Sequence, residues 1–300
     1  MATGKTNVSG GISPSATITI TYTGNHTDNI VMLADGNLYR LLTLTTSGIL
    51  TPSKPIRNAK LWYCNGGTGG GGGDTFNTSV GTVPAARRGG DGGGFGYSSL
   101  FTFDQPISVI IGAGSSGSGG YGTPSAGGST SVSAANDSSL PTNFEIIATH
   151  AGSGGGTGNN NYSNPGSGNG GVSTRPFFDA YFEPHCAGGG GGGFYDVYGS
   201  TNQKGTGGAG GTDGSAGSKF IMTGTAQGGI GGSKGGGAGG TPSYQNSAAN
   251  NGANAIFYGG GGGGSATYEN EDTQSSYGAD YRSGSGGNGY QGVCYILIRI

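Results

Sequence analysis

The residues of this chain that could do acid–base chemistry are a few carboxylates in its polar segments. Hydrolysis of a glycosidic bond uses two carboxyl groups that flank the scissile bond. The candidates are Asp179 and Glu183 in one segment and Glu269, Glu271 and Asp272 in another. The second group is typical of a solvated loop, so the sequence predicts a protein that is not an enzyme, with a glycosidase as an alternative.

The histidines and cysteines lack the spacing of a metal or thiol-nucleophile site. A zinc site needs several ligands close in sequence, and His185-Cys186 has none nearby. The three cysteines of the chain lie far apart and imply no disulfide framework. We therefore expect Cys64, Cys186 and Cys294 to be small packed hydrophobic residues, and we expect no metal and no cofactor.

Two glycine motifs formally match nucleotide-binding patterns. The segment 112–117 fits Gly-x-Gly-x-x-Gly after a strand-like segment, but that motif needs a helix behind it. Residues 115–125 are rich in glycine and contain a proline, so no helix is expected there. Gly4-Lys5-Thr6 lacks the upstream loop of a phosphate-binding P-loop. In a chain with 74 glycines among 300 residues, both matches are expected by chance.

Aromatic residues in polar segments are the strongest binding signal. Tyrosine offers a large contact area with few rotatable bonds, which suits binding loops. Such residues could instead pack over the ends of a scaffold that lacks large side chains, and Phe177 and Phe178 fit that interpretation. The candidate receptor contacts are the tyrosines of the loops: Tyr162, Tyr181, Tyr198, Tyr244, Tyr268, Tyr277 and Tyr281.

The segments that must position these loops are mostly glycine, with uninterrupted runs at 69–73, 188–193 and 259–264. Such runs could be flexible linkers. However, apolar and aromatic residues flank them, and they recur along the whole chain. The alternative is a packed bundle of polyglycine II helices, which are left-handed, have three residues per turn and leave their backbone groups to bond neighbours. The sequence favours the packed bundle.

Alternating and apolar segments predict strands around these runs. Residues 24–29 are expected to form a turn, as are Asp35-Gly36-Asn37, and Gln105-Pro106 is expected to join two strands. No segment predicts a helix. The expected fold is all-β: an antiparallel β-sandwich combined with a packed bundle of polyglycine II helices. The predicted strands are residues 16–22, 30–33, 38–45, 59–64, 97–103, 107–111, 144–148 and 293–300.

Composition excludes several partners. Hydrophobic residues make up 31% of the chain, too few for a conventional core of this size, and charged residues only 9%. The formal net charge is −2 without a basic cluster, so no nucleic-acid binding is expected. No apolar run approaches the ~20 residues that span a bilayer, so no membrane insertion is expected. The first residues form no hydrophobic signal region, which predicts synthesis in the host cytoplasm without a signal peptide.

The order of segments resembles the glycine-rich domain of bacteriophage tail and tail-fibre proteins. The motifs are a strand and Thr46-Ser47-Gly48, then residues 61–67 leading into polyglycine, residues 107–114 ending in Gly-Ala-Gly, Gly-Gly-Ser-Thr-Ser-Val at 127–132, and the closing strand 292–300. The similarity covers about residues 38–300. Cys64-Asn65 interrupts the Val-Gly-Gly pattern of that family, and residues 1–37 carry none of its motifs.

The resemblance implies a β-sandwich with a polyglycine II bundle and a role in host recognition, as in the tip adhesins of T-even-like phages. Residues 38–300 would be the glycine-rich domain with variable end loops, and residues 1–37 an N-terminal β segment for virion attachment. The expected partners are a host surface glycan or outer protein, other phage tail proteins, and further copies of the chain, a trimer being one option. The expected location is the virion tail. A purely structural tail or head decoration protein is the main alternative, and an ice-binding-like role is another.

Overall fold

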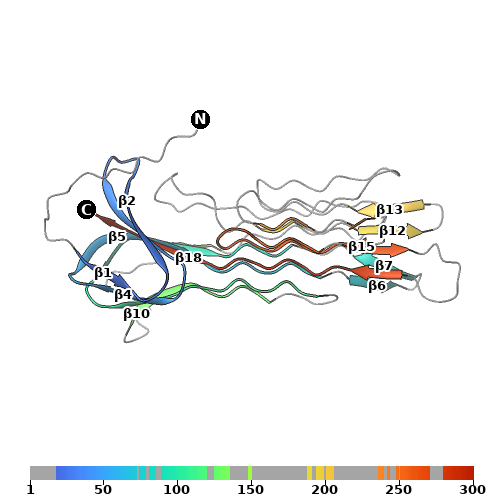
Figure 1. Cartoon of the computed structure of the whole chain (residues 1–300), viewed down its shortest axis with the longest axis horizontal. Coiled ribbons are helices and arrows are strands. Elements are labelled where there is room, and N and C mark those ends of the chain that lie inside the picture. The colour runs from blue at the N-terminus through green and yellow to red at the C-terminus, as the bar shows by residue number, and fades with distance from the viewer. Residues whose placement is uncertain are drawn as a thin grey trace.

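The computed structural model describes residues 18–72, 74–78, 81–85, 89–119, 125–135, 148–150, 188–190, 194–198, 201–205, 236–239, 242–243, 248–249, 251–270 and 280–300. Within these ranges there is no helix, and the strands pair almost entirely in antiparallel fashion. The expected all-β class is therefore confirmed for the described part of the chain. Figure 1 shows an elongated molecule with paired strands at both ends and wavy glycine-rich segments running between them.

A six-stranded antiparallel sheet dominates one end of the molecule, hereafter the sheet end (Figure 1). Its order is β11-β8-β5-β18-β3-β2. The last strand of the chain lies in the middle, between β5 and β3. The bounds are β11 Ala148–His150, β8 Phe95–Phe103, β5 Ile56–Cys64, β18 Val293–Arg299, β3 Leu38–Leu44 and β2 His26–Met32.

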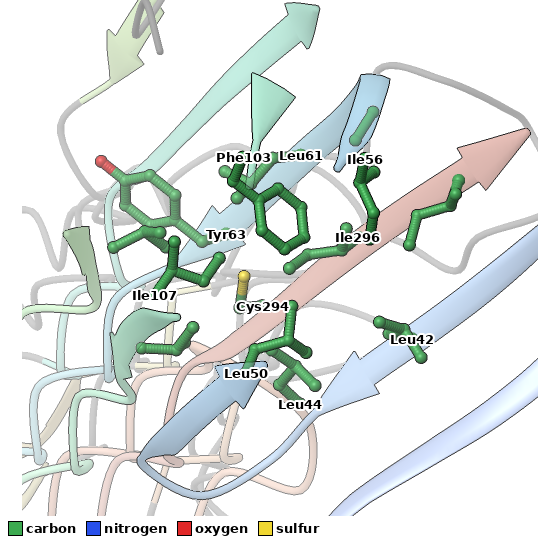
Figure 2. Packing of buried hydrophobic residues seen from close by; sticks show 14 residues of the cluster. Leu42, Leu44, Leu50, Ile56, Leu61, Tyr63, Phe103, Ile107, Cys294 and Ile296 are labelled. Atoms are coloured by element: carbon green, nitrogen blue, oxygen red, sulfur yellow. The ribbon is translucent and has the colours of Figure 1, made fainter. Parts of the chain in front are cut away.

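A four-stranded sheet packs against one face of the six-stranded sheet. Its order is β1-β4-β9-β10, with bounds Ile20–Tyr22, Gly48–Pro52, Ile107–Ile110 and Ser131–Ala134. The two sheets share one buried cluster, to which Leu50 and Val109 come from the smaller sheet and Leu44, Leu61 and Ile296 from the larger. Figure 2 shows Leu44, Leu50, Leu61 and Ile296 around Cys294. Burying a side chain such as Leu50 completely stabilises the fold by roughly 1.5–3 kcal/mol.

The opposite face of the six-stranded sheet is apolar as well. Trp62 is fully buried there and lies 5.9 Å, centroid to centroid, from both Phe95 and Tyr295. Tyr258, from a segment between the glycine runs, packs against the same cluster. Because β18 is covered on both sides, all its residues except Arg299 are buried. This explains why its sequence is a continuous apolar run rather than an alternating one.

Glycine-rich segments extend from the ends of these strands and form what we call the glycine region. It comprises the described residues 65–72, 89–94, 111–119, 125–130, 188–190, 236–239, 251–255, 259–266 and 284–292. Backbone hydrogen bonds join different segments. The amide of Gly67 donates to the carbonyl of Tyr290 (2.8 Å), and the amide of Gly70 donates to the carbonyl of Gly287 (2.7 Å). Successive bonds to the same neighbour are thus three residues apart.

The same period of three recurs between other segments. The amides of Ser115 and Ser118 donate to the carbonyls of Gly67 and Gly70, at 3.0 and 3.1 Å. The amides of Gly289 and Gly286 donate in turn to Ser115 and Ser118, both at 2.9 Å. Each segment therefore presents its backbone groups to several neighbours in succession, and residues 65–72 bond to segments on several sides.

At many glycines the close spacing of the segments leaves no room for a side chain. A Cβ atom built on Gly67 would lie 2.0 Å from the carbonyl oxygen of Gly260, and one on Gly70 would lie 2.0 Å from that of Gly263. The atoms in the way belong to backbone, which cannot move aside as a flexible side chain can. Glycine is required at these positions because neighbouring segments of the chain are in contact there, not because of an unusual φ angle.

Of the two turns predicted before residue 38, the structure contains one. The turn at Asp35-Gly36-Asn37 is confirmed: Gly36 has φ of 75° and its amide donates to the carbonyl of Leu33. The turn at residues 24–29 was wrong, because β2 begins at His26 and pairs with β3 along its whole length. Pairing overrides the polar sequence there, and an ion pair of Asp28 with Arg40 reinforces it.

The strands 97–103 and 107–111 were expected to be joined by a turn at Gln105-Pro106. Both strands exist, as β8 and β9, but they lie in different sheets, so the connection passes from one sheet to the other.

Residues on both sides of the proposed boundary at residue 37 belong to one sheet, since β2 pairs with β3. An attachment role for residues 1–37 stays a prediction.

Candidate functional site

The end of the molecule opposite the sheet end, hereafter the hairpin end, carries paired strands in segments that the sequence suggested were loops (Figure 1). Four of them form the distal sheet, in the order β13-β12-β16-β17. Two further hairpins are β6–β7 and β14–β15. The bounds are β12 Phe194–Tyr198, β13 Thr201–Gly205, β16 Thr267–Asn270, β17 Asp280–Ser283, β6 Asp74–Thr78, β7 Gly81–Ala85, β14 Pro242–Ser243 and β15 Ala248–Ala249.

The distal sheet inherits its order from the glycine region. The amide of Gly264 donates to the carbonyl of Gly190 (2.9 Å), so the segments that lead into β16 and β12 are already neighbours. These segments run in the same direction, and β12 and β16 accordingly form a parallel pair, Phe194 opposite Thr267. The amide of Gly284, just after β17, donates to the carbonyl of Ala266 (3.2 Å). The glycine region thus sets which strands meet at this end.

Three of the predicted contact tyrosines belong to the distal sheet. Tyr198 ends β12, while Tyr268 and Tyr281 lie in the adjacent strands β16 and β17. In the antiparallel pair, Tyr268 is opposite Arg282 and Tyr281 is opposite Glu269. Segments that are distant in the sequence therefore bring these tyrosines to one small sheet. The other candidates lie outside the described residues: Tyr162, Tyr181, Tyr244 and Tyr277.

Sequence reasoning missed Tyr195 as a candidate. It follows the six-glycine run directly, so it counted as a flanking residue rather than a loop residue. In the sheet it is opposite Tyr268 on one side and Lys204 on the other. Its signal was the short alternation Tyr195-Asp196-Val197, a pattern of the kind that half-buried strands share.

The nucleotide-like motif at 112–117 has no free loop to offer a phosphate. The amide of Gly112 donates to Oγ1 of Thr130 (3.0 Å), and the amide of Gly117 donates to Oδ1 of Asn288 (2.9 Å). The segment is part of the glycine region and is extended rather than helical. The second match, Gly4-Lys5-Thr6, lies outside the described residues.

The candidate acids and metal ligands fall mostly outside the described residues. Glu269 is in β16, opposite Asp196 and Tyr281, whereas Asp179, Glu183, Glu271 and Asp272 are not described. Within the described ranges, no group of His, Cys, Asp and Glu could hold a metal ion. His185 and Cys186 are not described.

Cys64 and Cys294 are free, fully buried thiols in β5 and β18. Burial raises the pKa of the Cys294 thiol, because the charged thiolate is disfavoured away from water. Cys294 and Cys64 each pack within one of the two buried apolar clusters, so the interpretation of these two cysteines as small hydrophobic residues is confirmed. Cys186 lies outside the described residues.

Exposed apolar side chains gather at the sheet end. The register of β2, β3 and β18 places Met32 opposite Leu38, and the amide of Ile300 donates to the carbonyl of Leu38 (3.2 Å). Met32 and Ile300 are each 60% exposed, and Ile30 on the same edge strand is 53% exposed. An edge strand with exposed apolar residues is a ready place for another chain to pair.

No protein-family model matches the chain, and a search of curated proteins finds none similar to it. Among the residues that the structure describes, no helix has the length and apolar character needed to cross a membrane.

Proposed function

We propose that this chain is a bacteriophage tail-fibre protein or receptor-binding adhesin that presents its hairpin end to the host surface. One observation carries the proposal. A glycine region with densely bonded backbones joins an apolar sheet end to a hairpin end where tyrosines from separate segments are brought together. A rigid rod with aromatic residues at its tip suits recognition, because little freedom is lost on binding.

The scaffold in this proposal is a polyglycine II bundle on an antiparallel β-sandwich. The three-residue period of the bonds between segments supports the first part, since polyglycine II helices have three residues per turn and no internal hydrogen bonds. The apolar cluster shared by the six-stranded and four-stranded sheets supports the second.

The sheet end is the proposed attachment end. Ile30, Met32 and Ile300 would be covered by another tail protein or by further copies of the chain, for which a trimer is one arrangement. Residues 1–37 belong to this end in the proposal, because β2 forms its edge. The chain would thus act in the virion tail, bind a host surface glycan or outer protein through its other end, and carry out no catalysis.

A double comparison of variants tests the proposal. The distal variant changes Tyr198, Tyr268 and Tyr281 to serine, and the proximal variant changes Ile30 and Met32 to serine. We expect the distal variant to lose binding to host cells while its self-association, measured by sedimentation, stays unchanged. The proximal variant should show the reverse. Cell binding that survives both the distal variant and exchange of residues 157–185 and 265–285 would contradict a receptor-binding role.

A structural tail or head component is the second candidate. The close backbone packing around Gly67 and Gly70 favours it, since such packing gives stiffness whatever the hairpins bind. The position of the chain in the particle separates the two functions: a distal tip supports the adhesin, and a place within a shell supports the structural component.

A further inference from the structure

The outer edge of β2 is an unpaired strand edge at the sheet end. Among the residues that the structure describes, β2 pairs only with β3, and no strand lies on its other side. Two apolar side chains are exposed along this strand, Ile30 at 53% and Met32 at 60%. An edge of this kind can add a strand from another chain, because the outward backbone groups of an edge strand have no ladder partner.

Two hydrogen bonds show which residues of β2 point their backbone groups outward. The carbonyl of Asn25 accepts from the amide of Thr45 (3.0 Å), and the amide of Leu33 donates to the carbonyl of Asn37 (3.2 Å). In an antiparallel pair, bonded positions alternate with non-bonded ones. The odd-numbered residues of β2 therefore bond to β3. The even-numbered residues direct their amides and carbonyls to the free edge, and these are His26, Asp28, Ile30 and Met32.

The strand lacks the features that usually protect an edge from pairing. Natural sheets protect their edges with lysine, proline, bulges or charged side chains. β2 contains neither lysine nor proline, and its register with β3 is continuous. Its one carboxylate, Asp28, is paired with Arg40 of β3. The sequence of β2 thus presents little barrier to the approach of another strand.

The last residues of β2 are self-complementary about Val31. When two copies of β2 pair antiparallel around a two-fold axis at Val31, Ile30 of each copy lies opposite Met32 of the other. Both residues are even-numbered, so the outward backbone groups of one strand meet those of the other, as an antiparallel ladder requires. The two exposed apolar side chains also cover each other, since aligned residues share one face of a sheet.

Other two-fold registers match the strand less well. An axis at Asn29 places Asp28 opposite Ile30 and leaves the two Asp28 carboxylates only roughly 7 Å apart along the strands. An axis at Ile30 places Asp28 opposite Met32. With the axis at Val31, the two carboxylates are roughly 20 Å apart along the strands, beyond the Debye length at physiological salt. Apolar contact and charge therefore favour the same register.

We propose that the sheet end is a symmetric interface between two copies of this chain, in which their β2 strands pair antiparallel around Val31. The six-stranded sheets of the two copies then form one continuous sheet. Such an interface closes after two copies, because each copy contributes the same surface. This inference rests on the proposed function, since it identifies the partner at the proposed attachment end as a second copy. It favours a dimer over a trimer.

Sedimentation of the full-length protein over a series of concentrations tests the pairing. We expect a one-copy species to convert into a two-copy species, with none larger. Ile30→Lys should raise the dissociation constant of the dimer at least about tenfold, because a charge replaces an apolar contact at the edge. The matched control is Ile49→Lys, which should leave the dissociation constant unchanged. Ile49 is 41% exposed, but its strand β4 is paired on both edges.

Disulfide trapping locates the axis. In the proposed register, Val31 lies opposite Val31 of the second copy as a non-hydrogen-bonded pair, with Cα atoms about 4.5 Å apart, which is within the range of a disulfide. Val31→Cys should therefore form a covalent dimer in oxidised glutathione. Asn29→Cys, on the same face of β2, should not. The parent protein, with its three cysteines, gives the background. This measurement keeps the proposal testable even if Ile30→Lys folds poorly.

Several results would overturn the inference: a monomer at every concentration, a three-copy species, equal weakening by the two lysine variants, no cross-linking of Val31→Cys, or cross-linking of Asn29→Cys in its place. These results are separable from failure of the proposed function. A monomer that binds host cells through the hairpin end would contradict the inference alone. A dimer that forms through β2 but binds no cells would contradict the receptor role and leave the interface.

Discussion

The sheet end and the glycine region build their interiors from different materials. At the sheet end, side chains such as Leu50, Ile107 and Ile296 fill the space between two sheets, and glycine is scarce (Figure 2). In the glycine region the interior is backbone, held by hydrogen bonds between neighbouring segments. The difference predicts opposite tolerances: a side-chain core accepts a change of shape, whereas a backbone core accepts no side chain in its contacts.

The largest effect is expected for Gly70→Ala. The added Cβ would lie 2.0 Å from the carbonyl oxygen of Gly263, and the bond from the amide of Gly70 to Gly287 would be pushed apart. We expect a loss of about 4 kcal/mol or more in the free energy of unfolding, measured by denaturant titration. Gly119→Ala is the control, because the nearest atom to its added Cβ is 3.9 Å away. Equal stability of the two variants would remove the basis for a backbone core.

A smaller effect is expected for Leu50→Ala at the sheet end. Leu50 is fully buried, so truncation leaves a cavity, and we expect a loss of about 3 kcal/mol in the same measurement. Leu50→Met keeps the volume and should cost less than about 1.5 kcal/mol. The comparison would be wrong if Leu50→Met were as damaging as Gly70→Ala.

The junction between the two regions offers a third test, at Thr130. Its buried hydroxyl donates to the carbonyl of Cys64 (2.6 Å) and accepts from the amide of Gly112 (3.0 Å). Thr130→Val leaves both groups without that partner, and we expect a loss of about 1–3 kcal/mol. Thr130→Ser keeps the hydroxyl, so its stability should be closer to that of the parent protein. Matching thermal denaturation curves for the valine and serine variants would contradict this role.

The smallest effect concerns pH. Hydrogen bonds from Tyr39 and from the amide of Asn37 lower the pKa of Asp35 from 3.8 to about 2. The folded state therefore favours the carboxylate, and this contribution to stability is present above pH 4 and lost as the pH falls toward 2. Asp35→Asn should make the melting temperature less dependent on pH in that window. The effect is small because the carboxylate is exposed. If the melting temperature of Asp35→Asn depended on pH as strongly as that of the parent protein, the hydrogen bonds to Asp35 would not contribute to stability.

Local patterns predicted most strands of the sheet end, but they missed the strands of the hairpin end, which lie in segments expected to be loops. The apolar run at 293–300 predicts a strand, but its central place depends on partners far away in the sequence. His26–Asn29 has a polar, turn-like sequence, so the predicted strand began only at residue 30. Pairing with β3 is what makes His26–Asn29 part of β2.

The candidate site was predictable in its residue type but not in its arrangement. Tyr268 and Tyr281 stood out as tyrosines in polar segments, whereas the alignment of Tyr195 with Tyr268 depends on which glycine segments are neighbours. Glycines carry no side-chain pattern that would reveal these neighbours. The order of the distal sheet could not be derived from the sequence for that reason.

Hydrogen-bonded backbone forms the interior of the glycine region. Hydrogen exchange of individual amides can check this, by comparing Gly67, Gly70 and Gly262 with the amides of β18. The bonds from these glycines to Tyr290, Gly287 and Thr68 predict slow exchange, similar to that of the central strand. Exchange of the glycine amides at the rate of an unfolded chain, with β18 still protected, would contradict the account.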